Sequence, residues 1–205
     1  NSANLLQSIK TETTEYEFFY DGFGNTDKVT IGGNEIVDYE YNPYNGKLHT
    51  INYENGFSVE YVYDELDNIK VVWYNNNGVR TKAFEYFYTA YGQMSRFDNL
   101  LTGKSISYKY DDDNRMTSYV EYDTDDMANT FASTIFYDEN SRPDFVYYYT
   151  SYNAGSTSAD SEIHYHHSYD DRIGNLDYYD VVTNSTRGKI DYVYDGFNRL
   201  EEKVY

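Results

Sequence analysis

Apolar and polar residues alternate along most of this chain, which predicts β-strands with one packed face and one solvated face. The alternation is clearest in the residues that lead into eight tyrosines. The second residue before each of them is apolar, aromatic or histidine: Phe18, Tyr39, Tyr61, Tyr86, Tyr108, Ile135, His167 and Tyr192. The third residue before each is polar: Glu17, Asp38, Glu60, Glu85, Ser107, Thr134, His166 and Asp191. We therefore expect each tyrosine to end a strand.

A turn signal follows each of these tyrosines. Aspartate, or a residue in its place, comes next: Tyr20-Asp21, Tyr41-Asn42, Tyr63-Asp64, Tyr88-Thr89, Tyr110-Asp111, Tyr137-Asp138, Tyr169-Asp170 and Tyr194-Asp195. A second signature then follows, as in Gly46-Lys47-Leu48 and Asn198-Arg199-Leu200. Because Asp accepts hydrogen bonds from nearby backbone N–H groups and Gly or Asn tolerates a positive φ, the two signals together predict a reversal. We expect these tyrosines and aspartates to be structural.

Most units carry another reversal midway between two tyrosines. The candidate turns are Gly33-Asn34, Asn55-Gly56, Asn77-Gly78, Thr102-Gly103 and Arg187-Gly188. Two longer units lack this signal, and we expect their segments Asp123 to Asn129 and Ser151 to Glu162 to be extended hairpin tips. The pattern predicts an all-β fold of roughly sixteen antiparallel strands, in which β-hairpin repeats form a long curved or spiralling sheet.

The repeat pattern spans residues 1–205 as a single array of about eight units. Asn4-Leu5 resembles the tail of a turn signature, and Leu200 opens a strand that has no return partner before Tyr205. We therefore expect the array to be truncated at both ends and to be continued by flanking repeats of the same parent protein.

Composition supports a folded β-protein and excludes several kinds of partner. There are 28 Tyr, 11 Phe and one Trp, and aromatic residues favour strands. The formal net charge of −19 repels nucleic acid and anionic membranes alike. No apolar run approaches the ~20 residues of a membrane span. The absence of cysteine excludes disulfides and thiolate metal sites.

These motifs resemble the YD-repeat, or Rhs (rearrangement hot spot) repeat, family. The closest matches are Tyr61-Val62-Tyr63-Asp64 and the segment from Tyr192 to Leu200. The resemblance implies a β-sheet that spirals into a hollow shell. In bacterial polymorphic toxins and insecticidal toxin complexes such a shell encloses a toxic domain, and animal teneurins carry a similar barrel on the cell surface. We therefore expect a wall segment of a large secreted or cell-surface bacterial protein, whose partners include flanking repeats and an encapsulated toxin domain.

The chain departs from the family where chemistry would be expected. Encapsulating members end in an Asp-Pro type motif and an aspartate-dependent cleavage site, whereas the prolines here are Pro43 and Pro143 and neither follows Asp. The sequence also contains no Cys nucleophile, no Gly-x-Ser-x-Gly elbow and no phosphate-binding loop. We expect a non-enzymatic scaffold without catalytic residues or a cofactor.

Two clusters raise the possibility of a metal ion. His164 and His166 share one strand face, and imidazole is a common zinc ligand, but a third ligand would have to come from another strand. The acidic runs Asp111 to Asn114 and Asp123 to Asp126 offer oxygen ligands for calcium without EF-hand spacing. A polar strand face and solvated turns explain these residues better.

A carbohydrate- or surface-binding module is the alternative function. Tyrosine and tryptophan rings can stack on sugars, which makes Trp73, Tyr74 and the run Tyr147-Tyr148-Tyr149 candidates for contacts with a surface glycan. The competing interpretation is that these rings pair across strands and stabilise the sheet. We favour that interpretation because the tyrosine positions follow the repeat so closely.

Overall fold

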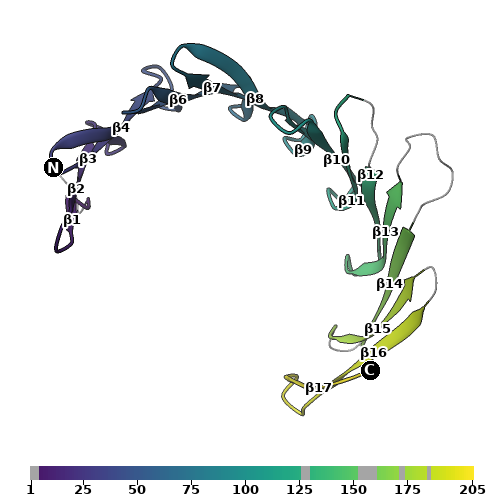
Figure 1. Cartoon of the computed structure of the whole chain (residues 1–205). Coiled ribbons are helices and arrows are strands. Elements are labelled where there is room, and N and C mark those ends of the chain that lie inside the picture. Colours follow the sequence, from purple (N-terminus) through teal and green to yellow (C-terminus); the bar gives the residue numbers. More distant parts are fainter. Residues whose placement is uncertain (1–4, 126–129, 152–160, 171–173, 184–185) are drawn as a thin grey trace. The chain divides into compact units, whose positions relative to one another are not determined.

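The computed structural model describes residues 5–125, 130–151, 161–170, 174–183 and 186–205 (Figure 1). This part of the chain is all-β, as predicted, with no helix. Its seventeen strands are β1 (Ser8–Lys10), β2 (Glu15–Tyr20), β3 (Thr26–Ile31), β4 (Asn34–Tyr41), β5 (Leu48–Tyr53), β6 (Phe57–Tyr63), β7 (Ile69–Asn76), β8 (Val79–Tyr88), β9 (Met94–Asn99), β10 (Lys104–Tyr110), β11 (Met116–Asp123), β12 (Thr130–Tyr137), β13 (Pro143–Ser151), β14 (Ser161–Tyr169), β15 (Leu176–Thr183), β16 (Arg187–Tyr194) and β17 (Leu200–Val204). Among the described residues no helix of the length and apolarity of a membrane span occurs.

The strands fall into two compact units. The first comprises residues 1–92 and 99–101, and the second comprises residues 93–98 and 102–205. In the first unit, each strand from β1 to β7 pairs with the next strand in antiparallel register, so that the series ends at β8. In the second unit, β9 pairs with β10, and each strand from β10 to β16 pairs with the next strand. Each unit is therefore a meander of hairpins.

Each repeat tyrosine is the last residue of its strand, as the alternation predicts. The register shifts immediately before the tyrosine at Tyr20, Tyr41, Tyr63, Tyr110, Tyr137, Tyr169 and Tyr194. Such a β-bulge bends the strand and re-aims the side chain that follows it. The bulge thus turns each tyrosine out of the regular ladder at the point where the chain reverses.

Three of the midway reversals lie where the sequence predicts them. Gly56, Gly78 and Gly103 have φ of 80°, 87° and 67°, values that a side chain would resist. The first reversal lies one residue earlier than expected: Gly32 and Gly33 form the turn with φ of 55° and 82°, and Asn34 already begins β4.

The predicted turn at Arg187-Gly188 is wrong, because both residues lie in β16 and Gly188 pairs with Val181. The reversal comes earlier, where the backbone N–H of Thr183 donates to the Thr186 carbonyl at 2.8 Å. The Thr186 N–H in turn donates to Thr183 Oγ1 at 3.1 Å. Threonine hydroxyls can form such turns without glycine. The two predicted hairpin tips fall largely on residues 126–129 and 152–160, outside the described residues.

Full burial is rare in these single-layered units. The buried apolar residues are Val29, Val37, Val59, Val71, Val72, Ala83, Tyr122, Ala132 and Val146. Rings on neighbouring strands supply much of the remaining packing, and Tyr74 meets Phe57 and Phe84 edge-on at centroid distances of 5.3 and 5.8 Å. Such cross-strand pairs stabilise a sheet that has no second layer over it.

Candidate functional site: the tyrosine-aspartate edge

The aspartate of each described five-residue turn organises the backbone around it. Asp64 Oδ1 accepts the backbone N–H groups of Leu66 and Asn68 at 2.9 and 2.8 Å. The same two bonds, to the second and fourth residues after the aspartate, recur at Asp21, Asp111, Asp138 and Asp195. A carboxylate that accepts two backbone donors replaces the ladder bonds that the chain gives up as it reverses.

Substitutes for aspartate retain part of this arrangement. Asn42 Oδ1 accepts the N–H of Tyr44 at 2.9 Å, and Thr89 Oγ1 accepts that of Tyr91 at 3.3 Å. The turn from Asn42 is one residue longer than the five-residue form, since the Asn42 N–H bonds the Lys47 carbonyl. The turn thus tolerates a neutral acceptor and an added residue.

The residue before the end of each turn has a positive φ. Glycine occupies this place at Gly24, Gly46, Gly92 and Gly174, and other residues occupy it at Asp67, Asn114, Ser141 and Asn198, with φ between 63° and 70°. Short polar side chains tolerate this left-handed conformation better than branched ones. The second sequence signature, such as Gly46-Lys47-Leu48, therefore begins at the residue with left-handed backbone and continues into the residues after it.

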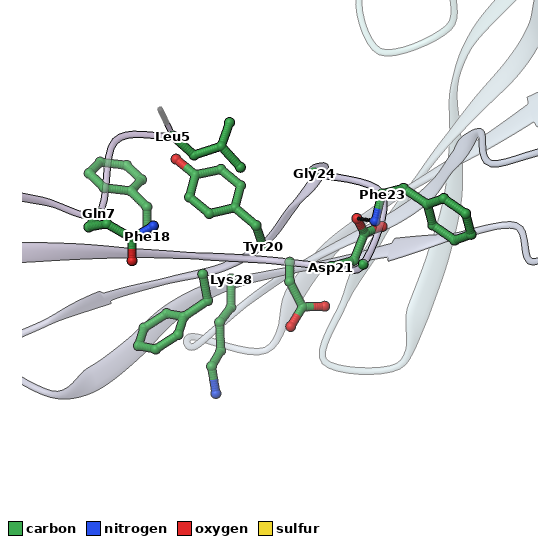
Figure 2. A pocket seen from close by; sticks show the side chains of 11 residues that line it. Leu5, Gln7, Phe18, Tyr20, Asp21, Phe23, Gly24 and Lys28 are labelled. Carbon is green, nitrogen blue, oxygen red and sulfur yellow. Dashed lines mark hydrogen bonds between the residues drawn. The ribbon is translucent and has the colours of Figure 1, made fainter. Parts of the chain in front are cut away.

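Every repeat tyrosine donates a hydrogen bond from its hydroxyl to a backbone carbonyl near the start of the preceding strand. The pairs are Tyr20 with Leu6, Tyr41 with Thr26, Tyr63 with Leu48, Tyr88 with Ile69, Tyr110 with Met94, Tyr137 with Met116, Tyr169 with Pro143 and Tyr194 with Leu176, at 2.7 to 2.9 Å. Figure 2 shows the first of these tyrosines, Tyr20, with its hydroxyl end beside the segment of Leu5. Each tyrosine therefore closes the open end of a hairpin.

The repeat tyrosines are partly buried. Tyr63, Tyr110 and Tyr194, which we expected to be largely buried in ring stacks, are of intermediate exposure. A single-layered sheet leaves one side of each ring open, and in three units a cation from the preceding turn covers that side. Lys47 lies 4.7 Å from the Tyr63 ring centroid, and Arg115 and Arg142 lie 4.7 and 4.3 Å from the rings of Tyr137 and Tyr169.

The last residue of the turn, which supplies these cations, also links one turn to the next. Lys47 donates to the carbonyl of Asp67 and lies 3.3 Å from its carboxylate, while Arg115 Nη1 donates to Ser141 Oγ at 2.9 Å. Gln93 makes a third such contact, to the Asn114 carbonyl at 3.1 Å. In each case the acceptor belongs to the left-handed residue of the next turn. At these three places the last residue of one turn therefore contacts the next turn along the chain.

The turn aspartates are held in their charged form. The pKa values of Asp21, Asp64, Asp111, Asp138 and Asp195 all lie below the usual value. At Asp21 the largest cause is the hydrogen bond from the Asn25 side chain, and at Asp195 it is the N–H of Arg199. At the other three, partial desolvation is the largest single influence and raises the pKa, but hydrogen bonds from the fourth residue after the aspartate outweigh it.

The tyrosine hydroxyls show the opposite shift. Desolvation raises the pKa of Tyr41, Tyr63, Tyr88, Tyr110 and Tyr169, and is the largest cause at each. A raised pKa keeps the proton on the hydroxyl, which is the form that can donate to a carbonyl.

The same fold occurs within toxin-complex chains. A crystal structure of TcdB2-TccC3 matches with a TM-score of 0.55 at 12% identity, covering 93% of this chain and 13% of that chain. A structure of the Photorhabdus luminescens Tc holotoxin pore matches with a TM-score of 0.54 at 13% identity, covering 93% of this chain and 12% of that chain. No family model and no curated protein matches the sequence. At this identity the likeness concerns the fold, and this chain spans a small part of those chains.

The candidate metal clusters are engaged in other contacts. His166 stacks on Phe145 at 4.3 Å between centroids, and His164 lies 4.5 Å from the Tyr147 ring. Arg115 pairs with both Asp111 and Asp113, at 2.8 and 3.2 Å. In the described part of the chain no three metal-ligating side chains gather, while Asp126 lies outside that part.

The aromatic residues suggested for sugar binding pack against other side chains. The Arg80 guanidinium lies 3.9 Å from the Trp73 ring centroid, held there by two hydrogen bonds to Glu60. Tyr148 lies between Phe131 and Tyr165, at centroid distances of 6.1 and 5.8 Å. These contacts agree with the interpretation that the rings pack across strands and stabilise the sheet.

Proposed function

We propose that this chain is a non-catalytic wall segment of a YD-repeat β-shell in a large secreted or cell-surface bacterial protein. In this proposal residues 1–205 belong to one continuous array, which flanking repeats of the same protein extend. The wall encloses or displays another domain, such as a toxin. The repeat tyrosines and aspartates have a structural role.

The hydrogen bond from tyrosine to carbonyl, present in all eight units, carries this proposal. An enzyme concentrates its distinctive side chains at one site, whereas here equivalent groups are spread evenly along an edge and each is used within its own hairpin. Such a distribution is typical of repeat scaffolds, in which each unit is stabilised by its neighbours. The similarity in fold to toxin-complex chains supports the same conclusion.

Limited proteolysis of the full-length parent protein tests the proposal. If the array is a wall, the polypeptide C-terminal to it should resist trypsin, and electron microscopy should show density enclosed by the repeats. The triple variant Tyr63→Ala, Tyr110→Ala, Tyr194→Ala should lose this protection, because it opens three hairpins. The control variant Tyr44→Ala, Tyr91→Ala changes rings that are 96% and 84% exposed and should retain it. Equal digestion of the C-terminal polypeptide in all three proteins would contradict the proposal.

A further inference from the structure

A shallow pocket on the sheet of the second unit has walls made mostly of aromatic rings. It holds about 350 Å³ and lies on β12, β13 and β14, where it is lined by Thr134, Phe136, Tyr147, Tyr148, Tyr149 and His164. A volume of this size, with a mostly apolar lining and a few polar atoms, is typical of sites for small molecules. No lysine or arginine is among the described residues that line it. This site is called the aromatic pocket below.

Three rings form a corner of the aromatic pocket. The rings of Phe136 and Tyr147 are nearly perpendicular, at 80°, with their centroids 5.8 Å apart. The His164 ring lies 4.5 Å from the Tyr147 ring, and Phe136 is 55% exposed. Rings that are held in place before binding lose less conformational entropy when a ligand arrives. A ligand that enters this corner can therefore contact more than one preordered ring.

The exposed ring of Phe136 has a counterpart in the first unit that is covered by a cation. Phe19 and Phe136 each stand immediately before a repeat tyrosine. The cross-strand partner of Phe19 is Lys28, whose ammonium group lies 5.2 Å from the centroid of the Phe19 ring. The cross-strand partner of Phe136 is instead Phe145. At the same position of the repeat, the second unit therefore has a ring where the first unit has an ammonium group.

Other rings of the chain also meet a cation that the chain itself supplies. Arg80 lies 3.9 Å from the centroid of the Trp73 ring, and Lys189 lies 4.0 Å from that of Tyr178. The electron-rich face of an aromatic ring attracts a positive charge. The aromatic pocket thus offers a ring surface of the kind that elsewhere in the chain lies against a lysine or an arginine.

We propose that the aromatic pocket binds the quaternary ammonium group of a small soluble molecule. Such a group has no N–H to donate, so its methyl groups can lie against aromatic rings while the rings attract its charge. A calcium ion would need six or more oxygen ligands, which these rings do not supply. The charge of the protein also favours a cation, since the formal net charge is −19 and the strand register places Glu162 opposite Tyr149.

An NMR titration of this chain with choline and with 3,3-dimethylbutan-1-ol tests the proposal. The second compound has the shape of choline but carries a carbon atom in place of the charged nitrogen. At pH 8, where histidine is ordinarily neutral, choline should bind at least about fivefold more tightly than this uncharged analogue. The methyl protons of bound choline should shift upfield because they lie over ring faces.

Variants of two equivalent phenylalanines separate the attraction of the ring for charge from apolar contact. Phe136→Leu keeps an apolar side chain without a ring and should lose the preference for choline, whereas Phe136→Trp should retain it. Phe145→Lys supplies an ammonium group at the position that Lys28 has in the first unit, and it should exclude choline. Phe19→Leu is the matched control, because it removes a ring that already has its cation, and it should bind choline like the unmodified protein.

Three results would overturn the proposal. The first is equal binding of choline and its uncharged analogue, and the second is unchanged binding of choline by the Phe136→Leu variant. The third is attachment of the chain to phosphatidylcholine vesicles without binding of free choline, which would indicate a lipid surface instead of a soluble ligand.

Discussion

The hydroxyl of Tyr110 donates a hydrogen bond of 2.8 Å to the carbonyl of Met94, across the open end of the hairpin that β9 and β10 form. Tyr110→Phe removes this bond alone and should lower the free energy of unfolding by about 1 kcal/mol. Tyr110→Ala also removes the ring, which is only partly buried, and should cost about 2 kcal/mol. Chemical denaturation measures both changes.

Tyr91→Phe is the matched control for these variants, because Tyr91 is 84% exposed and its substitution should leave the stability unchanged. A Tyr110→Phe protein as stable as the unmodified chain would show that the bond to Met94 contributes nothing.

The turn at Asp64 should distinguish the role of an oxygen acceptor from the role of charge. Asp64→Ala removes the acceptor of two backbone N–H groups and should lower the melting temperature. Asp64→Asn keeps an acceptor, as Asn42 does in its own turn, and should lower the melting temperature less. If the two variants melt together, charge and not hydrogen bonding is what the aspartate supplies.

Acid should destabilise the protein through the turn aspartates. The pKa values of these aspartates are lower in the folded state than in the unfolded state. Their contribution to stability is therefore complete above the unfolded pKa of about 3.9, and it is lost as the pH falls through the folded pKa values. Melting temperatures between pH 6 and pH 2, followed by circular dichroism, should therefore fall below about pH 4. Replacing Asp111 and Asp138 together by Asn should make this fall shallower, and an unchanged slope would contradict the assignment.

Alkali should destabilise it through the tyrosines. Their folded pKa values are raised, so the contribution to stability is complete below the unfolded value of about 10 and disappears as the pH rises through the folded values. The absorbance of tyrosinate gives the titration directly, and it should lag behind that of a denatured sample. Coincident titration curves in the two samples would contradict this prediction.

Much of the fold follows from local sequence. Alternation and turn residues predict where strands end, because both act within a few residues: Tyr63 ends β6, and Asn77-Gly78 forms the turn between β7 and β8. Prediction was less accurate where two turn chemistries compete within one segment. The Thr183 to Thr186 turn displaced the one expected at Gly188, which pairs within a strand instead.

The contacts at the turn edge could not be predicted in the same way. The Tyr63 hydroxyl binds a carbonyl of Leu48, a group that every residue has and that no sequence pattern marks. The partner of Trp73 depends on a register shift between Val72 and Trp73, and this shift has no sequence signal that we recognise.

Because each repeat tyrosine binds a main-chain oxygen, the side chain on the receiving residue is free to vary. Leucine, threonine, isoleucine, methionine and proline all fill that role in this chain. One unit can therefore drift in sequence, or lengthen its hairpin, without a compensating change in its neighbour. A bond of this kind therefore places no constraint on the identity of the residue that receives it.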